Sequence, residues 1–182
     1  MKVLIYNGGT SNKNTNLVVN KYKDLCIDRG IEVVFLDDYF KDCINCQFCS
    51  KNKRCCIPDQ LSEVLSTEKF DAVVIATPIY FFNFSGKAKS FLDRLYCLDK
   101  SNLIFSILCV SGSPYEESGI DLVEEIMLRA CEFCGSYSTS TFYKTTFDEY
   151  TGHLTDSDVF YLNRIIEEME NLYGEIKNKE EN

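Results

Sequence analysis

Short apolar runs rich in β-branched residues alternate along this chain with segments whose apolar residues recur at helical spacing. The runs predict five strands, at residues 2–6, 31–36, 70–76, 103–110 and 135–142. The segments between them predict helices at residues 15–28, 59–65, 85–96 and 120–133, and a capping box of Thr155 and Asp158 predicts a last helix. Such alternation is typical of a parallel sheet with helices on both faces. We therefore expect residues 1–182 to form one α/β domain, with a charged tail that frays after about Gly174.

Parallel sheets of this class bind ligands at the carboxyl ends of their strands, which directs attention to the loops after Tyr6, Ala76 and Val110. The first loop, residues 7–15 (NGGTSNKNT), is small, rich in donors and leads directly into a helix. Its glycines let the backbone wrap around an anion, and its amides and hydroxyls can donate to phosphate oxygens. It matches neither GxxxxGK[ST] nor GxGxxG, which disfavours nucleoside triphosphate hydrolysis and dinucleotide binding. A phosphate-binding turn and an ordinary polar turn both remain open.

The second loop, residues 77–86 (TPIYFFNFSG), carries four aromatic residues in five positions directly after an apolar strand. One core has little room for all of them, so some should line a pocket or a surface. Asn83 suits hydrogen bonding to a planar heterocycle, whereas the aromatic residues alone also suit a contact between subunits, and both can hold. The third loop, residues 111–115 (SGSPY), is again small and rich in donors.

The chain has ten cysteines, five of them between Cys43 and Cys56, and it begins without an export signal, so a disulfide framework is not expected. The five in this segment form C-x2-C-x2-C-x5-C with one extra thiol, a spacing that lets thiolates converge on one inorganic centre. We expect Cys43, Cys46, Cys49 and Cys55 to be the ligands and Cys56 to be spare, because adjacent side chains diverge. Zinc in a tetrahedral site and free thiols without metal are the alternatives. The remaining cysteines stand among apolar residues and are expected in the core: Cys26, Cys97, Cys109, Cys131 and Cys134.

Charge and hydropathy exclude other classes of function. With 19 basic and 28 acidic residues the net charge is −9, which argues against a general nucleic-acid binder. No apolar run approaches the roughly 18 residues of a membrane span. We therefore expect a cytoplasmic protein without membrane or nucleic-acid partners.

The three loops and the cysteine segment together, with the stretch ATPIYFFNFSGKAKSFLDRL, resemble the flavodoxin-like NAD(P)H-dependent FMN reductases, and among these the iron–sulfur flavoproteins. The resemblance runs from about Met1 to Gly135 and is clearest at residues 76–95. It implies a flavodoxin-like three-layer fold with a five-stranded parallel sheet in the order 2-1-3-4-5. It also implies bound flavin mononucleotide (FMN) and a [4Fe-4S] cluster on the four cysteines. We expect such a cluster near the carboxyl end of the second strand, close enough to the flavin for electron exchange, within one subunit or across a dimer.

Carried over position by position, the resemblance implies two groups of flavin contacts. The phosphate would meet the first loop, at Gly9, Thr10, Ser11, Lys13, Asn14 and Thr15. The ring and ribityl chain would meet the second and third loops, at Pro78, Ile79, Tyr80, Phe81, Asn83, Ser111 and Gly112. The first loop departs from the family pattern, since it has no proline or arginine. Amides, hydroxyls and Lys13 would then hold the phosphate.

Three functions follow as hypotheses. The first is an FMN-dependent NAD(P)H oxidoreductase with an unidentified acceptor, in which flavin N5 takes the hydride and no side chain is needed as general acid or base. The second is an electron carrier that uses the cysteine cluster. The third is a binding module without redox activity. The aromatic loop predicts a homodimer or a higher homo-oligomer.

Overall fold

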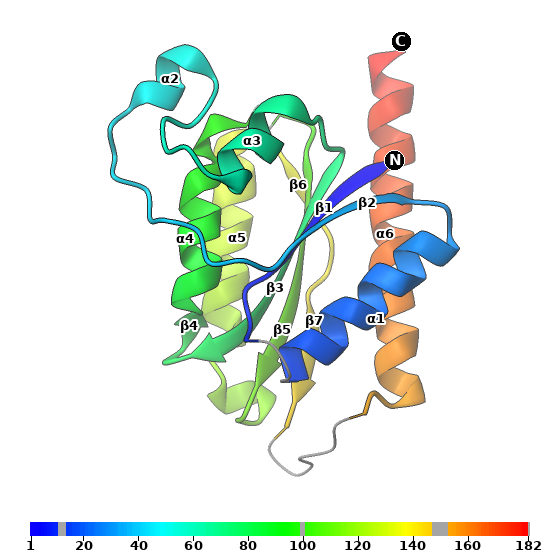
Figure 1. Ribbon diagram of the computed structural model, residues 1–182. Helices are drawn as coiled ribbons and strands as arrows, with labels where there is room; N and C mark the ends of the chain where they lie inside the picture. The colour runs from blue at the N-terminus through cyan, green and yellow to red at the C-terminus, as the bar shows by residue number, and fades with distance from the viewer. Residues whose placement is uncertain (11–13, 99–100, 147–152, 182) are drawn as a thin grey trace.

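The computed structural model describes residues 1–10, 14–98, 101–146 and 153–181, which form a three-layer α/β/α domain (Figure 1). Its central layer is a parallel sheet in the order β2-β1-β3-β5, with β6 and β7 together in the fifth position. The strands are β1 (Lys2–Asn7), β2 (Glu32–Leu36), β3 (Ala72–Tyr80), β5 (Ile104–Ser111), β6 (Tyr137–Ser138) and β7 (Phe142–Thr145). The predicted order 2-1-3-4-5 is confirmed.

The sheet has seven strands rather than the predicted five. The strand predicted at residues 135–142 is divided into the two short strands β6 and β7. Residues 139–141 between them are not paired with β5 as a strand. The Thr139 hydroxyl donates to the Ser106 hydroxyl (2.9 Å) or the Ser140 carbonyl (2.9 Å). A hydroxyl that bonds locally offers the backbone an alternative to the sheet.

The other additional strand is β4 (Asn83–Phe84), which pairs antiparallel with the end of β3. The strand predicted to stop at Ala76 continues to Tyr80, and the chain then turns back through Phe81 and Phe82. The sheet is therefore parallel except for this hairpin.

Helices cover the two faces of the sheet, as expected (Figure 1). The helices α1 (Asn14–Asp28) and α6 (Asp156–Glu180) share a core with Val3 and Ile5, while Leu4 and Tyr6 point to the opposite core. That opposite core holds α3 (Gln60–Thr67), α4 (Gly86–Arg94) and α5 (Ile120–Cys134). Because both faces are covered, β1 and β3 are apolar at nearly every position.

The C-terminal helix corrects the prediction of a frayed tail. The helix continues past Gly174 to Glu180. Its Ile176 side chain is buried in the core that α1 and α6 share, and Asn102 donates to the Glu180 carboxylate (3.3 Å). The predicted capping box of Thr155 and Asp158 is present at its start. No helix in the described ranges is both long and apolar enough to cross a membrane.

The segment between β2 and α3 carries the five clustered cysteines and only one short helix, α2 (Phe48–Asn52). Figure 1 shows that this segment leaves the carboxyl end of β2 and runs to the other end of the domain, where α2 lies far from β4. Two short 3-10 turns complete the list of elements, η1 (Leu95–Cys97) and η2 (Tyr115–Glu117).

Candidate functional site

The loops after β1 and β3 are joined where these strands end. The Gly8 amide donates to the Ala76 carbonyl (2.7 Å), and the Ser85 hydroxyl donates to the Gly8 carbonyl (2.7 Å). A Cβ on Gly8 would lie 2.7 Å from the Ala88 Cβ and 2.8 Å from the Ala76 carbonyl oxygen, so only glycine fits between the strand and α4. This close approach explains why position 8 requires glycine.

The first loop also folds back onto the N-terminus of α1. The Asn7 side chain accepts from the Gly9 amide (3.0 Å) and donates to the Asn16 side chain (3.1 Å). Thr15 is only 3 % exposed, and its hydroxyl has no hydrogen-bond partner in the described part of the chain. The helix N-terminus therefore presents an available hydroxyl beside first-turn amides that have no intrahelical partners, an arrangement that suits an anion.

Two residues that sequence reasoning missed support these loops. Ser85 caps α4, since its hydroxyl accepts from the Ala88 amide (3.1 Å), and its own amide donates to the Thr77 hydroxyl (3.1 Å). Lys87 donates to the Gly9 carbonyl (3.1 Å) and to the Asp37 carbonyl, and burial lowers its pKa although Asp37 and Asp38 oppose the shift. The sequence offers a signal for Ser85 alone, which is a serine directly before a segment with helical spacing of apolar residues.

The aromatic loop is a tight hairpin tip. Phe81 and Phe82 both have positive φ, 50° and 65°, which is uncommon for bulky residues and marks strain. Phe81 is 96 % exposed, whereas the backbone of Phe82 lies against Gly119, where a Cβ would be 2.7 Å from the Phe82 Cα. The hairpin thus contacts the start of α5 with one aromatic residue and offers the other to a ligand or a partner.

The third loop is fixed by the strand beside it. The Ser111 hydroxyl accepts from the Ser113 amide (3.1 Å), and the Ser113 carbonyl accepts from Tyr143 (2.7 Å) and Thr145 (2.8 Å). The Thr146 amide donates to the Ser111 carbonyl (2.8 Å). The loop that follows β5 is therefore held at the same edge of the sheet as the other two.

The structure places the predicted flavin contacts in three groups. Buried at the loop bases are Gly9, Thr15, Pro78, Ile79 and Ser111; exposed or half-buried are Thr10, Asn14, Tyr80, Phe81, Asn83 and Gly112. Ser11 and Lys13 lie outside the described residues. The Asn83 side-chain oxygen accepts from the Phe84 amide (2.8 Å), so its amide nitrogen is the group that remains for a ligand.

The clustered cysteines line a separate pocket of about 300 Å³. Its lining includes all five thiols from Cys43 to Cys56, together with Arg94 and Cys97 at the C-terminal end of α4. The loops after β1 and β3 meet the N-terminal end of this helix, and its nine residues span about 13 Å. The expectation that a cluster lies near the carboxyl end of the second strand is therefore wrong within one subunit, because the segment crosses to the opposite end of α4.

Two of the thiols in this pocket are in contact. The Sγ atoms of Cys46 and Cys56 are 3.1 Å apart. The Phe48 amide, followed by the Cys56 thiol, lowers the pKa of Cys46, while the bond to Cys46 raises the pKa of Cys56. Within the described ranges no three side chains of His, Cys, Asp or Glu are arranged to hold a metal ion. The thiols are thus gathered in number and type for a cluster but are not in ligand geometry.

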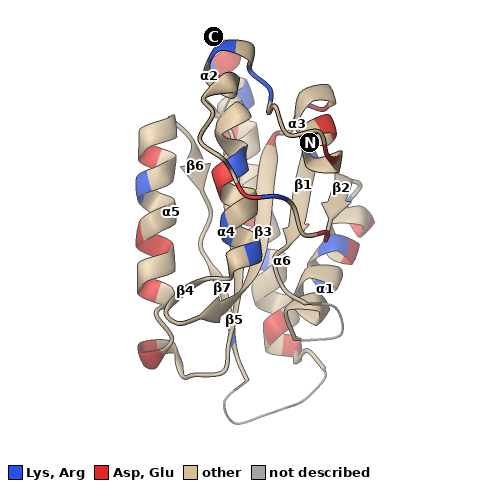
Figure 2. Cartoon of the chain, turned by 60° about the vertical axis from the view of Figure 1, so that its left-hand side comes forward, with Lys and Arg blue, Asp and Glu red and all other residues tan. Residues whose placement is uncertain are grey.

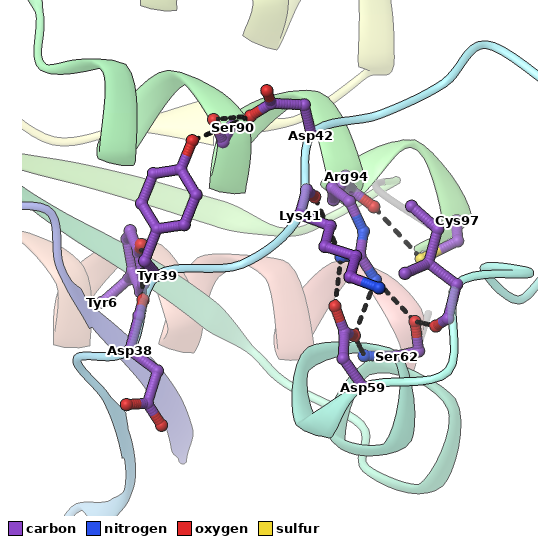
Figure 3. Close-up of polar contacts among 11 residues, drawn as sticks. Tyr6, Asp38, Tyr39, Lys41, Asp42, Asp59, Ser62, Ser90, Arg94 and Cys97 are labelled. Atoms are coloured by element: carbon purple, nitrogen blue, oxygen red, sulfur yellow. Dashed lines mark hydrogen bonds and ion pairs between the residues drawn. The ribbon is translucent and has the colours of Figure 1, made fainter.

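Arg94 is a charged residue in the lining of the cysteine pocket, and Figure 3 shows its side chain among Asp59, Ser62 and Lys41. Its side chain is fully buried and makes a bidentate ion pair with Asp59 (2.6 and 2.8 Å), with further bonds to Ser62 (2.6 Å) and the Lys41 carbonyl (3.2 Å). The Arg94 hydrogen bond holds the pKa of Asp59 below its usual value. Nε of Arg94 is buried without a hydrogen-bond partner in the described part of the chain.

The dispersed cysteines behave as core residues. Cys26, Cys97, Cys109 and Cys131 are buried, as predicted, whereas Cys134 is half-buried. Burial raises the pKa of Cys97 to about 11 and that of Cys131 to about 11, so these thiols stay protonated.

Comparison with known proteins identifies the family. The family model for NADPH-dependent FMN reductase matches residues 1–127. An iron–sulfur flavoprotein of Archaeoglobus fulgidus is 35 % identical over 100 residues, 52 % of this chain and 48 % of that protein. One of Methanocaldococcus jannaschii is 31 % identical over 99 residues, 52 % of this chain and 51 % of that protein. The chain thus aligns with about half the length of these curated relatives.

Solved structures agree on the fold. An NAD(P)H:quinone oxidoreductase from Methanothermobacter marburgensis superposes with a TM-score of 0.71 at 14 % identity, covering 90 % of this chain and 93 % of that chain. A flavodoxin of Streptococcus pneumonia TIGR4 gives a TM-score of 0.64 at 17 % identity, covering 94 % and 99 %. The loops after β1, β3 and β5 stand at the strand ends where ligands bind in this class of fold. With the family model matched over 127 residues of this fold, the chain belongs to the NADPH-dependent FMN reductase family.

Proposed function

We propose that this protein is an FMN-dependent oxidoreductase that takes electrons from NAD(P)H and passes them to an acceptor. The observation that carries the proposal is that donor-rich loops follow β1, β3 and β5 at one edge of the sheet, the first two joined by hydrogen bonds, in a chain of this family. FMN supplies the hydride chemistry when bound. The protein's part is to hold and orient it.

The residues present fit FMN at this edge. The free hydroxyl of Thr15 and the amides at the start of α1 would donate to the phosphate, and Ser11 and Lys13 remain predicted contacts. Ile79 and the exposed rings of Tyr80 and Phe81 would form an apolar wall beside the isoalloxazine. Ser111 and Gly112 would approach the ring from the third loop. No side chain has to act as a general acid or base, so we name no catalytic residue.

An FMN titration tests the site. Thr15→Val removes one hydroxyl from a buried position and keeps the side-chain shape. We expect it to weaken FMN binding by about 1–3 kcal/mol, roughly 5- to 150-fold. Thr67→Val on the exposed end of α3 is the matched control and should bind FMN as the unmodified protein does. Equal affinities of the unmodified protein and Thr15→Val for FMN would show that Thr15 is not part of the site. The reductase function has its own test: if neither NADH nor NADPH reduces the FMN-loaded protein anaerobically, that function is refuted.

A second candidate is an iron–sulfur flavoprotein that carries electrons through a [4Fe-4S] cluster. Five thiols line one pocket, and curated relatives bear that name. Cys43, Cys46, Cys49 and Cys55 would be the thiolate ligands. Because the pocket lies at the far end of α4 from the flavin loops, the electrons would have to cross about 13 Å within a subunit or pass between subunits. Iron and sulfide analysis after anaerobic reconstitution tests this, and protein without iron would refute it.

We further propose a homodimer that uses the β3–β4 hairpin and works in the cytoplasm. Phe81 is almost fully exposed at the hairpin tip and Tyr80 and Phe82 are more than half exposed, a contiguous apolar set of the kind that marks interaction sites. Light scattering should report a dimer for the unmodified protein and a shift toward monomer for Phe81→Ser. A monomeric unmodified protein at high concentration would overturn this part.

A further inference from the structure

We propose that Cys46 and Cys56 form a reversible disulfide that closes the cysteine pocket. Their Sγ atoms lie 3.1 Å apart across ten residues of chain. A disulfide bond is about 2.05 Å long, so the two sulfurs need to approach by about 1 Å.

The positions of both thiols allow this approach. Cys46 and Cys56 are exposed, and each lies outside a helix or strand, on either side of α2. Cys46 stands between Asn45 and Gln47, which both have positive φ, so its backbone is irregular and belongs to no hydrogen-bonded ladder. A small shift therefore breaks no secondary structure, and a small-molecule oxidant can reach either sulfur.

The neighbouring thiols are less suited to this bond. Cys55 is half-buried and packs on the core that holds α3, α4 and α5. Cys49 is half-buried against the same core. In the described ranges Cys46 and Cys56 are the thiols that contact one another. The contact therefore selects one pair among the five thiols of the pocket.

The charge of the surrounding segment favours an anionic oxidant. Lys51, Lys53 and Arg54 lie between the two cysteines, and Figure 2 shows basic residues on the chain that joins α2 to α3. A low-molecular-weight disulfide that carries carboxylates, such as oxidised glutathione, matches this basic surface although the chain as a whole has a charge of −9.

The reaction balances as a thiol–disulfide exchange. One cysteine, as its thiolate, attacks the small disulfide, forms a mixed disulfide and releases one small thiol. The second cysteine loses its proton to solvent and attacks the mixed disulfide, which releases the second small thiol. The protein loses two electrons and two protons, and the small disulfide gains them.

This inference goes beyond the proposed function and connects to it at one residue. Cys46 is also a proposed cluster ligand, and a sulfur in a disulfide cannot bind iron as a thiolate. The disulfide and the cluster should therefore exclude one another. This last consequence rests on the proposed cluster, whereas the disulfide itself does not.

The experiment uses the full chain, reduced anaerobically, freed of reductant and then treated with excess oxidised glutathione. Thiols that remain are alkylated after denaturation and counted by intact mass. We expect the count to fall from ten to eight. Trypsin cleaves at Lys51, Lys53 and Arg54, so the bond should join peptide 42–51 to peptide 55–69.

Variants then locate the bond. Cys46→Ser and Cys56→Ser should keep all nine remaining thiols free, whereas the matched controls Cys43→Ser and Cys55→Ser should still lose two. A wild-type count that stays at ten, or a linked pair of peptides that persists in Cys56→Ser, would overturn the proposal. In a parallel reconstitution the oxidised protein should take up no iron and the reduced protein should take up a cluster. If the reduced protein also takes up none, the cluster proposal fails, while the thiol count still decides the disulfide.

Discussion

Replacing Asp59 by asparagine should destabilise the protein strongly without removing a helix cap. Asp59 does two things: its Oδ1 accepts from the Ser62 amide at the start of α3 (3.0 Å), and both carboxylate oxygens bind Arg94. Asparagine is as good an N-cap as aspartate, so the cap can remain. The substitution therefore removes the negative charge opposite a fully buried guanidinium and little else.

The size of the effect follows from where the two partners lie. Breaking a buried ion pair by removing one partner costs about 3–5 kcal/mol, because the remaining charge stays buried without compensation. Asp59 is 20 % exposed while Arg94 is 0 % exposed, so solvent reaches only one side of the pair. We therefore take the low end, about 3 kcal/mol. For a chain of this size that corresponds to a fall in Tm of roughly 6–12 °C.

Urea unfolding of the protein without cofactors at neutral pH measures this loss. Asp93→Asn is the matched control, since Asp93 pairs with Lys89 on the surface and both side chains are about half exposed. It should change the free energy of unfolding by less than about 0.5 kcal/mol. The reasoning would be refuted if Asp59→Asn cost less than about 1 kcal/mol or no more than the control.

Three further predictions follow from single contacts. Because Arg94 lowers the pKa of Asp59, the stabilisation by this carboxylate is complete above its unfolded-state pKa of about 3.8 and is lost as the pH falls through its lower folded-state pKa. Asp59→Asn should therefore make the free energy of unfolding depend less on pH in the acid range, and an unchanged dependence would contradict this. Gly8→Ala puts a Cβ 2.7 Å from the Ala88 Cβ and should cost about 1–3 kcal/mol in urea unfolding and weaken FMN binding, so a variant with unchanged stability and affinity would show that the loop tolerates side chains. Gly174→Ala has open space around its new Cβ within α6 and should raise the free energy of unfolding by about 0.5–1 kcal/mol, whereas a loss would mean that the helix does not continue as described.

The sheet was predictable because its strands are covered on both faces. Residues in β1 and β3 must be apolar almost without interruption, and such runs stand out in a sequence. At the break between β6 and β7 the Thr139 hydroxyl bonds instead to Ser106, which lies 33 residues earlier. Likewise, the last turns of α6 are ordered by one buried residue, Ile176, in an otherwise charged tail. Local patterns carry no record of such distant partners.

In the candidate site too, some features were predictable from local patterns and others depended on distant partners. The three loops could be placed from strand ends alone, because the parallel sheet brings those ends to one edge. Lys87 and Arg94 could not be assigned, since their partners Gly9 and Asp59 lie 78 and 35 residues away. The position of the cysteines was also missed. The segment after β2 is long enough to reach either end of the domain, and the spacing of its cysteines does not indicate to which end it runs.

The separation of the two sites along α4 has an evolutionary consequence. Residues 37–59 leave the sheet after β2 and return at α3, and no strand pairing depends on them. The part of this segment from Cys43 to Cys56 can therefore lengthen, shorten or exchange its cysteines by mutation, while the contacts of Asp37 and Asp59, the register of the sheet and the loops at the other end stay the same. Selection can therefore change the thiol chemistry at one end of the domain without altering the loops at the other end, where we propose that FMN binds.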